Sequence, residues 1–441
     1  MPAAGYTISY IATAESVAWS GSNGSIDDGF EALLYNPAGI FMTNRRAGLN
    51  LFGSYGARVA MNFASSDDVI KVLQYSLSGT NITTNSWLDG FFTRIPHHGT
   101  DIAIDVSALN FMSYFKYETF AIGVLLSSKT YSTTLISKSF YSILFDELDI
   151  RTPVSFSLNS VLLSYIDLNV ALSTRVGFLE ELLPVKAVYA GLSFHVYVPL
   201  IYARMNISGN MTSIDDGTGV LMPGMRMRGT FSAGGPLLLL NTYVPQLQGF
   251  TPNGGFGLGV DMGMIFEVFS FMKIGFAVTD LGFMVLPEAE DSVINITAGL
   301  MEMTSVAQTI FSGAKTKVPT GMMPATAIRA GIGFTPLRNK EMLLIAFDVT
   351  VGDFNRLVYN EPPSVNIATG IEFKPGFDWF SVPMRFAFCY NTAANFPSFA
   401  VGFGLHFGPV EFELGVKGLE FFIPNLGARE LVVGFDMKFQ F

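Results

Sequence analysis

LVVGFDMKFQF, residues 431–441, alternates strictly between apolar side chains and other side chains. In an extended strand, successive side chains point to opposite faces, so one face of this segment carries a continuous apolar row. That row is Leu431, Val433, Phe435, Met437, Phe439 and Phe441, opposite Val432, Gly434, Asp436, Lys438 and Gln440. About eleven residues are what a tilted strand needs to cross a bilayer. The segment predicts a membrane-crossing strand with one lipid face and one water-tolerant face.

The same alternation returns throughout the second half of the chain. Apolar side chains alternate with mainly glycine, alanine and charged side chains in residues 256–268, 328–334, 365–374, 384–391, 399–407 and 410–417. The first half predicts less regular strands over residues 49–63, 111–117, 120–127, 154–163, 166–176 and 185–198. Brief breaks such as residues 406–409 suit tight turns between antiparallel neighbours. Together the candidates predict about 14 strands in an up-and-down meander.

Four regions break the alternation, at residues 65–101, 129–151, 215–252 and 287–319. They contain many of the aspartate and glutamate residues and predict long loops. A short helix is expected separately at residues 178–183. Long loops at one end and short turns at the other are usual in membrane barrels.

Composition also favours a membrane barrel. Hydrophobic residues make up 49% of the chain, mean hydropathy is +0.39 and 14% of residues are charged, against roughly 25% in soluble domains. The longest uncharged stretch, residues 229–260, contains several prolines and Gly-Gly pairs that an apolar membrane helix would not carry. A closed barrel is the other structure that satisfies its backbone within lipid, so we expect an all-β transmembrane antiparallel barrel.

Several other kinds of site and activity are not expected. The net charge of −10 gives no electrostatic reason to bind nucleic acid. The single Cys389 cannot form an internal disulfide, and the His97–His98 pair lacks the further ligands that a metal site would need. His195 and His406 stand alone on strands, where we expect them to face the barrel interior. No nucleophile motif is present, so we expect no enzyme activity, no metal and no cofactor.

The N-terminal residues 1–45 do not have a strand pattern and form a separate expected segment. Residues 12–18 and 30–34 are helix-tolerant and are separated by a flexible Gly-Ser stretch. Pro37 then forces Asn36 away from helix, and Gly39 permits a reversal, so residues 36–39 predict a fixed bend. A wide barrel leaks unless it is plugged. We therefore expect residues 1–45 to be a hatch and residues 46–441 the barrel.

The start of the chain has no secretory signal peptide, because Met1 is followed by neither a basic stretch nor an apolar core. We expect the sequence to be a mature form from which a signal has been removed.

The Asn36-Pro37-Ala38-Gly39 bend, placed after a small helix-tolerant segment and before an aromatic-rich meander that ends in phenylalanine, resembles the FadL family. These are outer-membrane transporters for long-chain fatty acids and other hydrophobic compounds, and the likeness is closest to the spirochaete-type FadL-like barrels. The resemblance implies 14 strands and an inward-folded hatch that carries Asn36, Pro37 and Ala38. It also implies lateral exit of substrate through a gap in the wall. The terminal Phe441 resembles the signal that addresses such barrels to their insertion machinery.

These observations lead to one functional expectation and two rivals. We expect a monomeric protein of the bacterial outer membrane, surrounded by its lipids, that takes up hydrophobic compounds such as long-chain fatty acids by passive diffusion. The first rival is a FadL-like barrel that serves as a docking component, like PorV, or as a surface adhesin. The second rival is a soluble all-β protein of several sandwiches.

The charged side chains assigned to the lumen leave two uses open. They either pair with one another across the interior or meet the carboxylate of a fatty acid. Arg329 and Arg385 are the candidates for a carboxylate, because a guanidinium matches a carboxylate in a two-pronged contact. The full set is Asp261, Glu267, Arg329, Glu372, Lys374 and Arg385.

Overall fold

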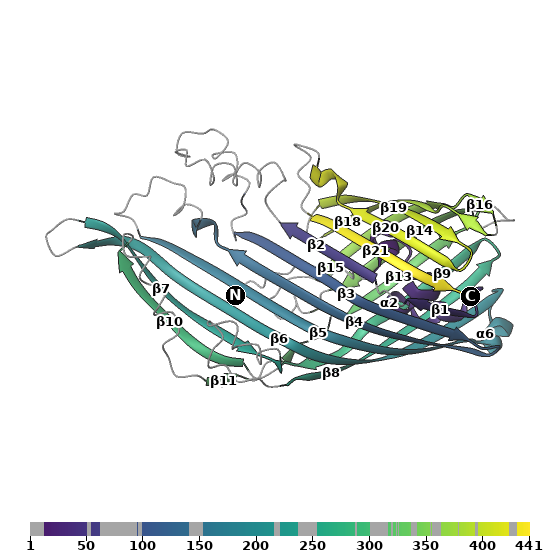
Figure 1. Cartoon of the computed structure of the whole chain (residues 1–441), viewed down its shortest axis with the longest axis horizontal. Coiled ribbons are helices and arrows are strands. Elements are labelled where there is room, and N and C mark those ends of the chain that lie inside the picture. The colour runs from purple at the N-terminus through teal and green to yellow at the C-terminus, as the bar shows by residue number, and fades with distance from the viewer. Residues whose placement is uncertain are drawn as a thin grey trace.

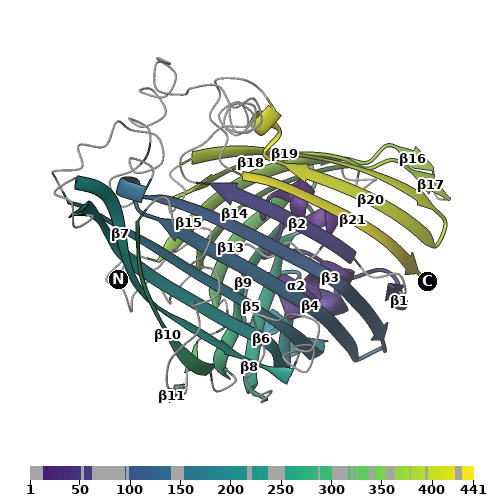
Figure 2. The same cartoon turned by 60° about the vertical axis from the view of Figure 1, so that its left-hand side comes forward.

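The strands of the chain close into a barrel (Figures 1 and 2). The computed structural model describes residues 13–50, 54–61, 95, 99–140, 153–215, 221–236, 254–286, 289–299, 316–318, 321–322, 324, 326–336, 342–352, 354, 363–377, 379–392, 396–422 and 430–441. The barrel closes because β1 (Ala47–Asn50) and β2 (Ser54–Met61) each pair with β21 (Glu430–Gln440) on one side and β3 (Thr100–Lys116) on the other. The last strand therefore pairs with the first strand, as a closed barrel requires.

The barrel has 14 antiparallel strands, as predicted, formed by 21 strand segments. One strand each is made by β1 with β2, β7 with β8, β9 with β10, β11 and β12 with β13, β15 with β16, and β17 with β18. The remaining bounds are β4 (Phe120–Ile136), β5 (Val154–Arg175), β6 (Ala187–Asp215), β7 (Leu221–Gly234), β8 (Phe256–Phe269), β9 (Met272–Val285), β10 (Ala289–Gly299), β11 (Thr316–Val318), β12 (Gly321–Met322), β13 (Ala327–Phe334), β14 (Leu343–Gly352), β15 (Ser364–Phe373), β16 (Gly376–Phe377), β17 (Phe380–Ser381), β18 (Met384–Asn391), β19 (Phe396–Phe407) and β20 (Val410–Lys417).

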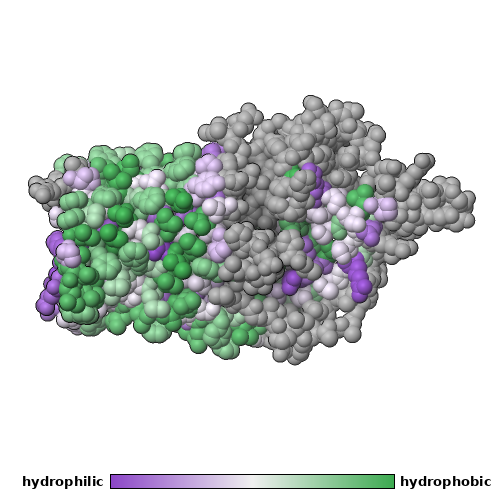
Figure 3. All heavy atoms as spheres, turned by 180° about the vertical axis from the view of Figure 1, so that it is seen from behind, coloured by the Kyte–Doolittle hydropathy of each residue, from purple (hydrophilic) through white to green (hydrophobic). Residues whose placement is uncertain are grey.

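The two faces of the strands differ as the sequence predicts. On β21, Phe435 is 46% exposed while Asp436 and Lys438 are buried. The same holds on β19, where Phe399 and Phe403 are exposed. Apolar side chains cover one half of the barrel on the face seen in Figure 3. Apolar side chains therefore point outward and polar ones inward, which is the arrangement of a barrel in lipid.

Among the described residues, none of the helices has the length and apolar character needed to cross a membrane.

Parts of the predicted loops are strands, which corrects the sequence-based boundaries. Residues 129–136 continue β4, and β7 and β10 lie inside two regions predicted as loops. Residues 129–136 and 289–299 have serine, threonine or asparagine at both odd and even positions, so their sequences show no apolar alternation. Residues 154–175, predicted as two strands, form the single strand β5. His97, His98 and most of the predicted loop residues lie outside the described part of the chain.

One side of the barrel continues beyond the apolar band. Strand β6 has 29 residues and β5 has 22, although about 9 to 11 suffice to cross a bilayer. In this part, hydroxyl groups bond across the strands, with 2.8 Å between Thr130 and Ser164 and 3.0 Å between Thr134 and Ser160. Strands β5, β6, β7 and β10 extend away from the other strands in Figure 1. We call residues 128–136, 154–164, 202–215 and 221–234 the polar extension.

The N-terminal residues 13–46, which we call the hatch, lie inside the barrel (Figure 2). Three short helices form it: α1 (Ala14–Trp19), α2 (Gly29–Tyr35) and the 3-10 helix η1 (Pro37–Phe41). Helix α1 packs on β18 to β21, and η1 packs on β4, β5, β6 and β8, so the hatch reaches opposite walls. Two further short helices in the described part of the chain, α6 (Gly177–Leu182) and η8 (Leu419–Phe422), lie outside the hatch. The predicted helical segments are present, at α1, α2 and α6.

Candidate functional site

Asn36 ties the bend of the hatch to the barrel wall. Its side chain is fully buried and donates hydrogen bonds to the Ser25 carbonyl at 2.5 Å and, more weakly, to the Met264 and Phe276 carbonyls at 3.5 and 3.4 Å. Its Oδ1 accepts from the Ala38 N–H at 3.2 Å and caps η1, with Pro37 at the first helical position. Residues 36–38 therefore link the hatch to strands β8 and β9.

A belt of wall glycines makes room for the hatch. A Cβ on Gly263 would collide with the Asn36 side chain, and one on Gly191 would meet the backbone of Pro37 and Ala38. The belt consists of Gly48, Gly123, Gly191, Gly263, Gly275, Gly331, Gly333, Gly370, Gly402, Gly415 and Gly434. Neighbours in the sheet continue it, as in the pairs Gly191↔Gly263 and Gly415↔Gly434. Glycines on the inner face are therefore required for close approach of the hatch backbone.

Two wall cations hold the acidic side chains of the hatch. Arg385 binds Glu15 of α1 at 3.0 Å, Glu372 at 2.6 Å and also Glu413. Lys438 binds Glu15 at 3.2 Å, Asp436 at 3.5 Å and also Glu31 of α2. We expected Arg385 either to pair with other charged side chains of the protein or to bind the carboxylate of a fatty acid. In the structure it pairs within the protein, because three carboxylates surround its guanidinium.

The carboxyl groups of Glu15 and Glu31 differ in charge because they share these cations unequally. Burial would raise the pKa of Glu15, but Arg385 and Lys438 outweigh it and hold that pKa below its ordinary value. Burial raises the pKa of Glu31 to about 8, since Lys438 only partly offsets it. At neutral pH, Glu15 is thus the charged anchor and Glu31 carries a proton.

Arg329 lies beside the hatch in a different setting. Its Nη1 donates to Thr350 Oγ1 at 2.9 Å, and its guanidinium carbon lies 4.9 Å from the centre of the Tyr35 ring. The side chain is buried, and its Nε has no hydrogen-bond partner. Within the described part of the chain Arg329 forms no ion pair. A buried guanidinium with an unused N–H remains able to bind an anion.

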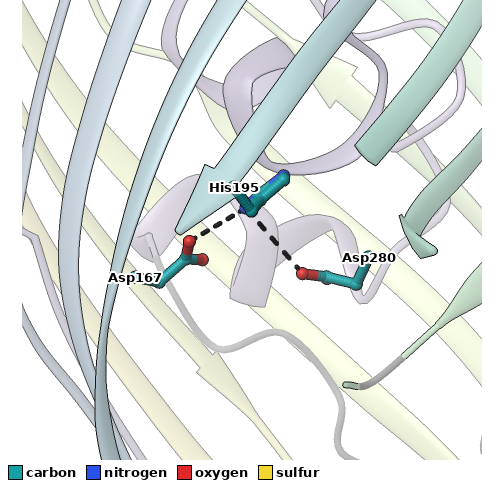
Figure 4. A group of neighbouring side chains, drawn as sticks. All are labelled: Asp167, His195 and Asp280. Carbon is teal, nitrogen blue, oxygen red and sulfur yellow. Dashed lines mark hydrogen bonds and ion pairs between the residues drawn. The ribbon is translucent and has the colours of Figure 1, made fainter. Parts of the chain in front are cut away.

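A second charged centre lies around His195 on β6 (Figure 4). His195 Nδ1 is 2.9 Å from Asp167 Oδ1 on β5 and 3.9 Å from Asp280 Oδ1 on β9. Its Nε2 is 2.8 Å from Asp261 Oδ2 on β8. Lys129 on β4 binds the other oxygen of Asp167 at 2.8 Å. Five strands from β4 to β9 therefore contribute to one buried centre, which we call the His195 centre.

The sequence placed His195 and Asp261 in the lumen but did not bring these residues together. Lys129 fell in a predicted loop, and Asp167 and Asp280 were not singled out. Their proximity depends on the register of the sheet, in which His195 lies opposite Asn169 and Gly259. The alternation of side chains along the strand could have placed Asp167 on the inner face. The register between neighbouring strands, which brings it next to His195, cannot be read from the sequence.

A buried apolar cluster adjoins the His195 centre on the side away from the hatch. Along β6, Gly191 meets the hatch, His195 follows, and Tyr197 and Tyr202 come next. The rings of Tyr165 and Tyr197 meet edge to face at 6.0 Å, and those of Tyr131 and Tyr165 at 6.2 Å. We call this the tyrosine cluster; its buried members are Leu163, Tyr165, Tyr197, Tyr202, Met284 and Leu286.

The remaining side chains expected in the lumen have ordinary structural partners. Glu267 lies 3.8 Å from Lys186, and His406 binds Glu413 at 2.6 Å. Lys374 follows the end of β15, and its backbone N–H bonds the Met342 carbonyl. Cys389 is buried and unoxidised.

The wall is irregular beside the tyrosine cluster. Asp280 has a left-handed backbone (φ 53°), its N–H bonds Asp261 Oδ1 at 2.6 Å, and its carbonyl accepts from Thr326 Oγ1 at 2.7 Å. Strand β9 pairs with β13 at Thr279↔Ala327 and with β12 at Met284↔Met322. The register is the same at both positions. On the other side of β9, the register with β8 shifts at the same level, between Val260 and Met262.

Comparison with known proteins bears on the fold. No protein-family model and no curated protein matches the chain. A FadL homologue from Pseudomonas aeruginosa superposes with a TM-score of 0.51 at 11% identity, covering 99% of this chain and 100% of that chain. The toluene transporters TodX of P. putida (TM-score 0.49, 12% identity, 98% of both chains) and TbuX of Ralstonia pickettii (0.47, 13%, 97% and 98%) are also similar. The chain therefore has the fold of a FadL-type barrel.

Proposed function

We propose that the protein takes up hydrophobic compounds, such as long-chain fatty acids, by passive diffusion across a bacterial outer membrane. The outward-facing apolar side chains suit a lipid environment. The hatch packs on opposite walls of the lumen, which supports a role as a plug against a free aqueous path. Movement of the hatch would then open the route.

The observation that carries the proposal is the tyrosine cluster. It lies in the interior between the hatch and the polar extension, and its buried members are aliphatic, methionine and tyrosine side chains. Channels for water-soluble compounds have polar interiors. An apolar solute gains about 25 cal/mol for each Å² that leaves water, so these side chains favour such a solute over a polar one.

Arg329 is the proposed contact for an acid group. Its unused Nε–H and the adjacent Tyr35 of the hatch would let a carboxylate bind where the hatch meets the wall. Arg385 is not proposed for this role, since it already binds Glu15, Glu372 and Glu413.

Binding to purified protein tests the proposal. A fluorescent fatty acid should bind the detergent-solubilised barrel, and Arg329→Met should weaken binding of the acid but not of the fatty alcohol of the same length. Arg329→Lys, which keeps the charge, is the matched control. Absence of binding by both acid and alcohol would contradict uptake, whereas equal weakening of both would contradict only the role of Arg329.

We place the lateral exit at the irregular stretch of β9 around Asp280, where the backbone is left-handed and the register with β8 shifts. Its inner side adjoins the tyrosine cluster, and the lipid-facing Leu281 is 45% exposed at the same level. A benzophenone side chain at position 281 should cross-link to a labelled fatty acid during uptake. Phe435, 46% exposed on β21, provides the matched lipid-facing control position. Equal labelling at both positions would argue against an exit here.

The polar extension favours a second candidate, docking of a partner protein. It carries strands beyond the apolar band and displays hydroxyl and amide side chains there. Recovery of a specific partner from intact outer membranes, together with absence of fatty-acid binding, would favour docking over transport.

A further inference from the structure

We infer that Asp167, His195 and Asp280 form a binding site for a divalent transition-metal ion, which goes beyond the proposed uptake function. The three residues come from β5, β6 and β9 and converge in the barrel interior (Figure 4). Each offers one ligand atom, and these atoms all lie within 4.8 Å of one another. All three side chains are buried, so little water competes for the ion.

The orientation of His195 suits a metal ligand. Asp261 Oδ2 lies 2.8 Å from Nε2, so with the proton on Nε2 the lone pair of Nδ1 faces Asp167 and Asp280 and can bind an ion between them. Histidine ligands commonly donate their second ring N–H to a carboxylate in this way. Asp261 is itself held by the Asp280 N–H at 2.6 Å. The ring of His195 also stacks on Tyr197 at 5.5 Å, which limits its rotation.

The charges in direct contact favour a dication. Asp167, Asp261 and Asp280 bring three carboxylates, and Lys129 brings one ammonium. With His195 neutral, the ionised group carries two net negative charges, and one divalent ion cancels them. Protonation of His195 would cancel only one of the two, and buried charge is costly when it is not balanced.

Unpartnered polar atoms around the centre indicate a further polar component. Asn169 Oδ1, Ser193 Oγ and Thr279 Oγ1 are completely buried and have no hydrogen-bond partner. Asn169 pairs with His195 in the sheet, Ser193 pairs with Asp261, and Thr279 precedes Asp280. Buried polar atoms nearly always have partners. Water molecules that complete the coordination of an ion would supply them.

The spacing of the ligand atoms is close to what an ion requires. Tetrahedral ligands at about 2.1 Å from Zn²⁺ lie about 3.4 Å from one another. The observed separations from His195 Nδ1, 2.9 Å to Asp167 and 3.9 Å to Asp280, lie on either side of that value. Three protein ligands and one water would complete the site. The ion would join β5 and β6 to β9 at the irregular stretch around Asp280.

Titration with Zn²⁺ tests the site on the full chain in detergent. The protein carries no histidine tag, has been treated with chelator, and contains His97→Gln and His98→Gln, so that His195 and His406 are the remaining histidines. We expect one Zn²⁺ per chain by calorimetry. His195→Gln and Asp280→Asn should each weaken binding at least about 100-fold, and Asp261→Asn about 10- to 100-fold. The control His406→Gln, whose ring also contacts carboxylates, should bind normally.

Histidine NMR on the parent protein keeps the test independent of variant folding. With ¹⁵N-labelled histidine, Zn²⁺ should shift the His195 ring signals and leave those of His406 unchanged. The site is overturned if the parent protein binds no Zn²⁺. It is also overturned if the His195 signals do not shift, or if folded His195→Gln and His406→Gln proteins bind Zn²⁺ equally.

Discussion

At the scale of single residues, Phe435 tests which face of a strand meets lipid. Its side chain is exposed, whereas the neighbouring residues Gly434 and Asp436 are buried. Phe435→Arg should lower the free energy of unfolding by about 2–4 kcal/mol if the position is near the bilayer midplane. Urea titration in phospholipid vesicles measures this, with Phe435→Leu as the control that keeps an apolar side chain. Undiminished stability of the arginine variant would show that this face does not meet lipid.

Glu31 gives the hatch a pH dependence. Burial raises its pKa to about 8 in the seated hatch, against 4.5 in water. Glu31 therefore binds its proton more tightly in the seated hatch than in water, and the bound proton stabilises the seated hatch. This contribution is complete below about pH 4.5, declines as the pH rises, and is lost above about pH 8. Trp19, buried in α1, should become accessible to an aqueous quencher as the pH rises from 7 to 9.

The control for this prediction is Glu31→Gln, which cannot titrate. Its Trp19 fluorescence should show the same quenching at pH 7 and pH 9. A wild-type hatch whose quenching does not change with pH, or a Gln variant that keeps the full response, would assign the effect to another group.

At the scale of elements, the glycine belt determines whether the hatch can seat. A Cβ at Gly191 would meet backbone atoms of Pro37 and Ala38, which cannot rotate away as a side chain can. Gly191→Ala should cost about 1–3 kcal/mol of hatch seating, and Gly191→Val more. Gly177, where a Cβ would meet nothing within 4 Å, is the control position.

Ion conductance in planar bilayers measures the seating of the hatch. Gly191→Val should leak ions where the wild type and Gly177→Ala do not. A sealed Gly191→Val barrel would mean that the hatch does not depend on close contact with β6.

The sequence predicted those strands whose two faces meet different surroundings. Residues 256–268 alternate because one face meets lipid and the other the hatch, and β8 occupies Phe256–Phe269. The sequence of β10 places polar residues at both odd and even positions, so it gives no periodic signal. Strand β7 does alternate, with Met225, Met227 and Phe231 opposite Arg226, Arg228 and Thr230, and was missed because it lies in a stretch broken by prolines and glycines. Helices α1 and α2 were recognised from small residues and the bend at Pro37, which are local features.

At the scale of the whole molecule, barrel closure followed from a hydrophobic sequence without membrane helices, and the approximate strand number followed from counting the alternating segments. The contacts inside the barrel could not be predicted in this way. The lumen position of Arg385 follows from its parity on β18, whereas its partner Glu15 comes from a segment 370 positions away. The His195 centre likewise joins strands whose register the sequence does not reveal. Side chains can be assigned to the interior from alternation, but their mutual contacts require the folded barrel.

The molecule thus combines an apolar outer wall, a hatch packed inside the lumen and an apolar interior cluster beyond the hatch. The most direct test of passive hydrophobic uptake uses intact cells of an outer-membrane bacterium that lacks its own fatty-acid channel. We expect cells that produce this protein to take up labelled oleate several-fold faster than cells without it, with no gain in entry of a hydrophilic sugar of similar mass. Equal oleate uptake by both cell types, with the folded barrel present in the outer membrane, would contradict the proposal.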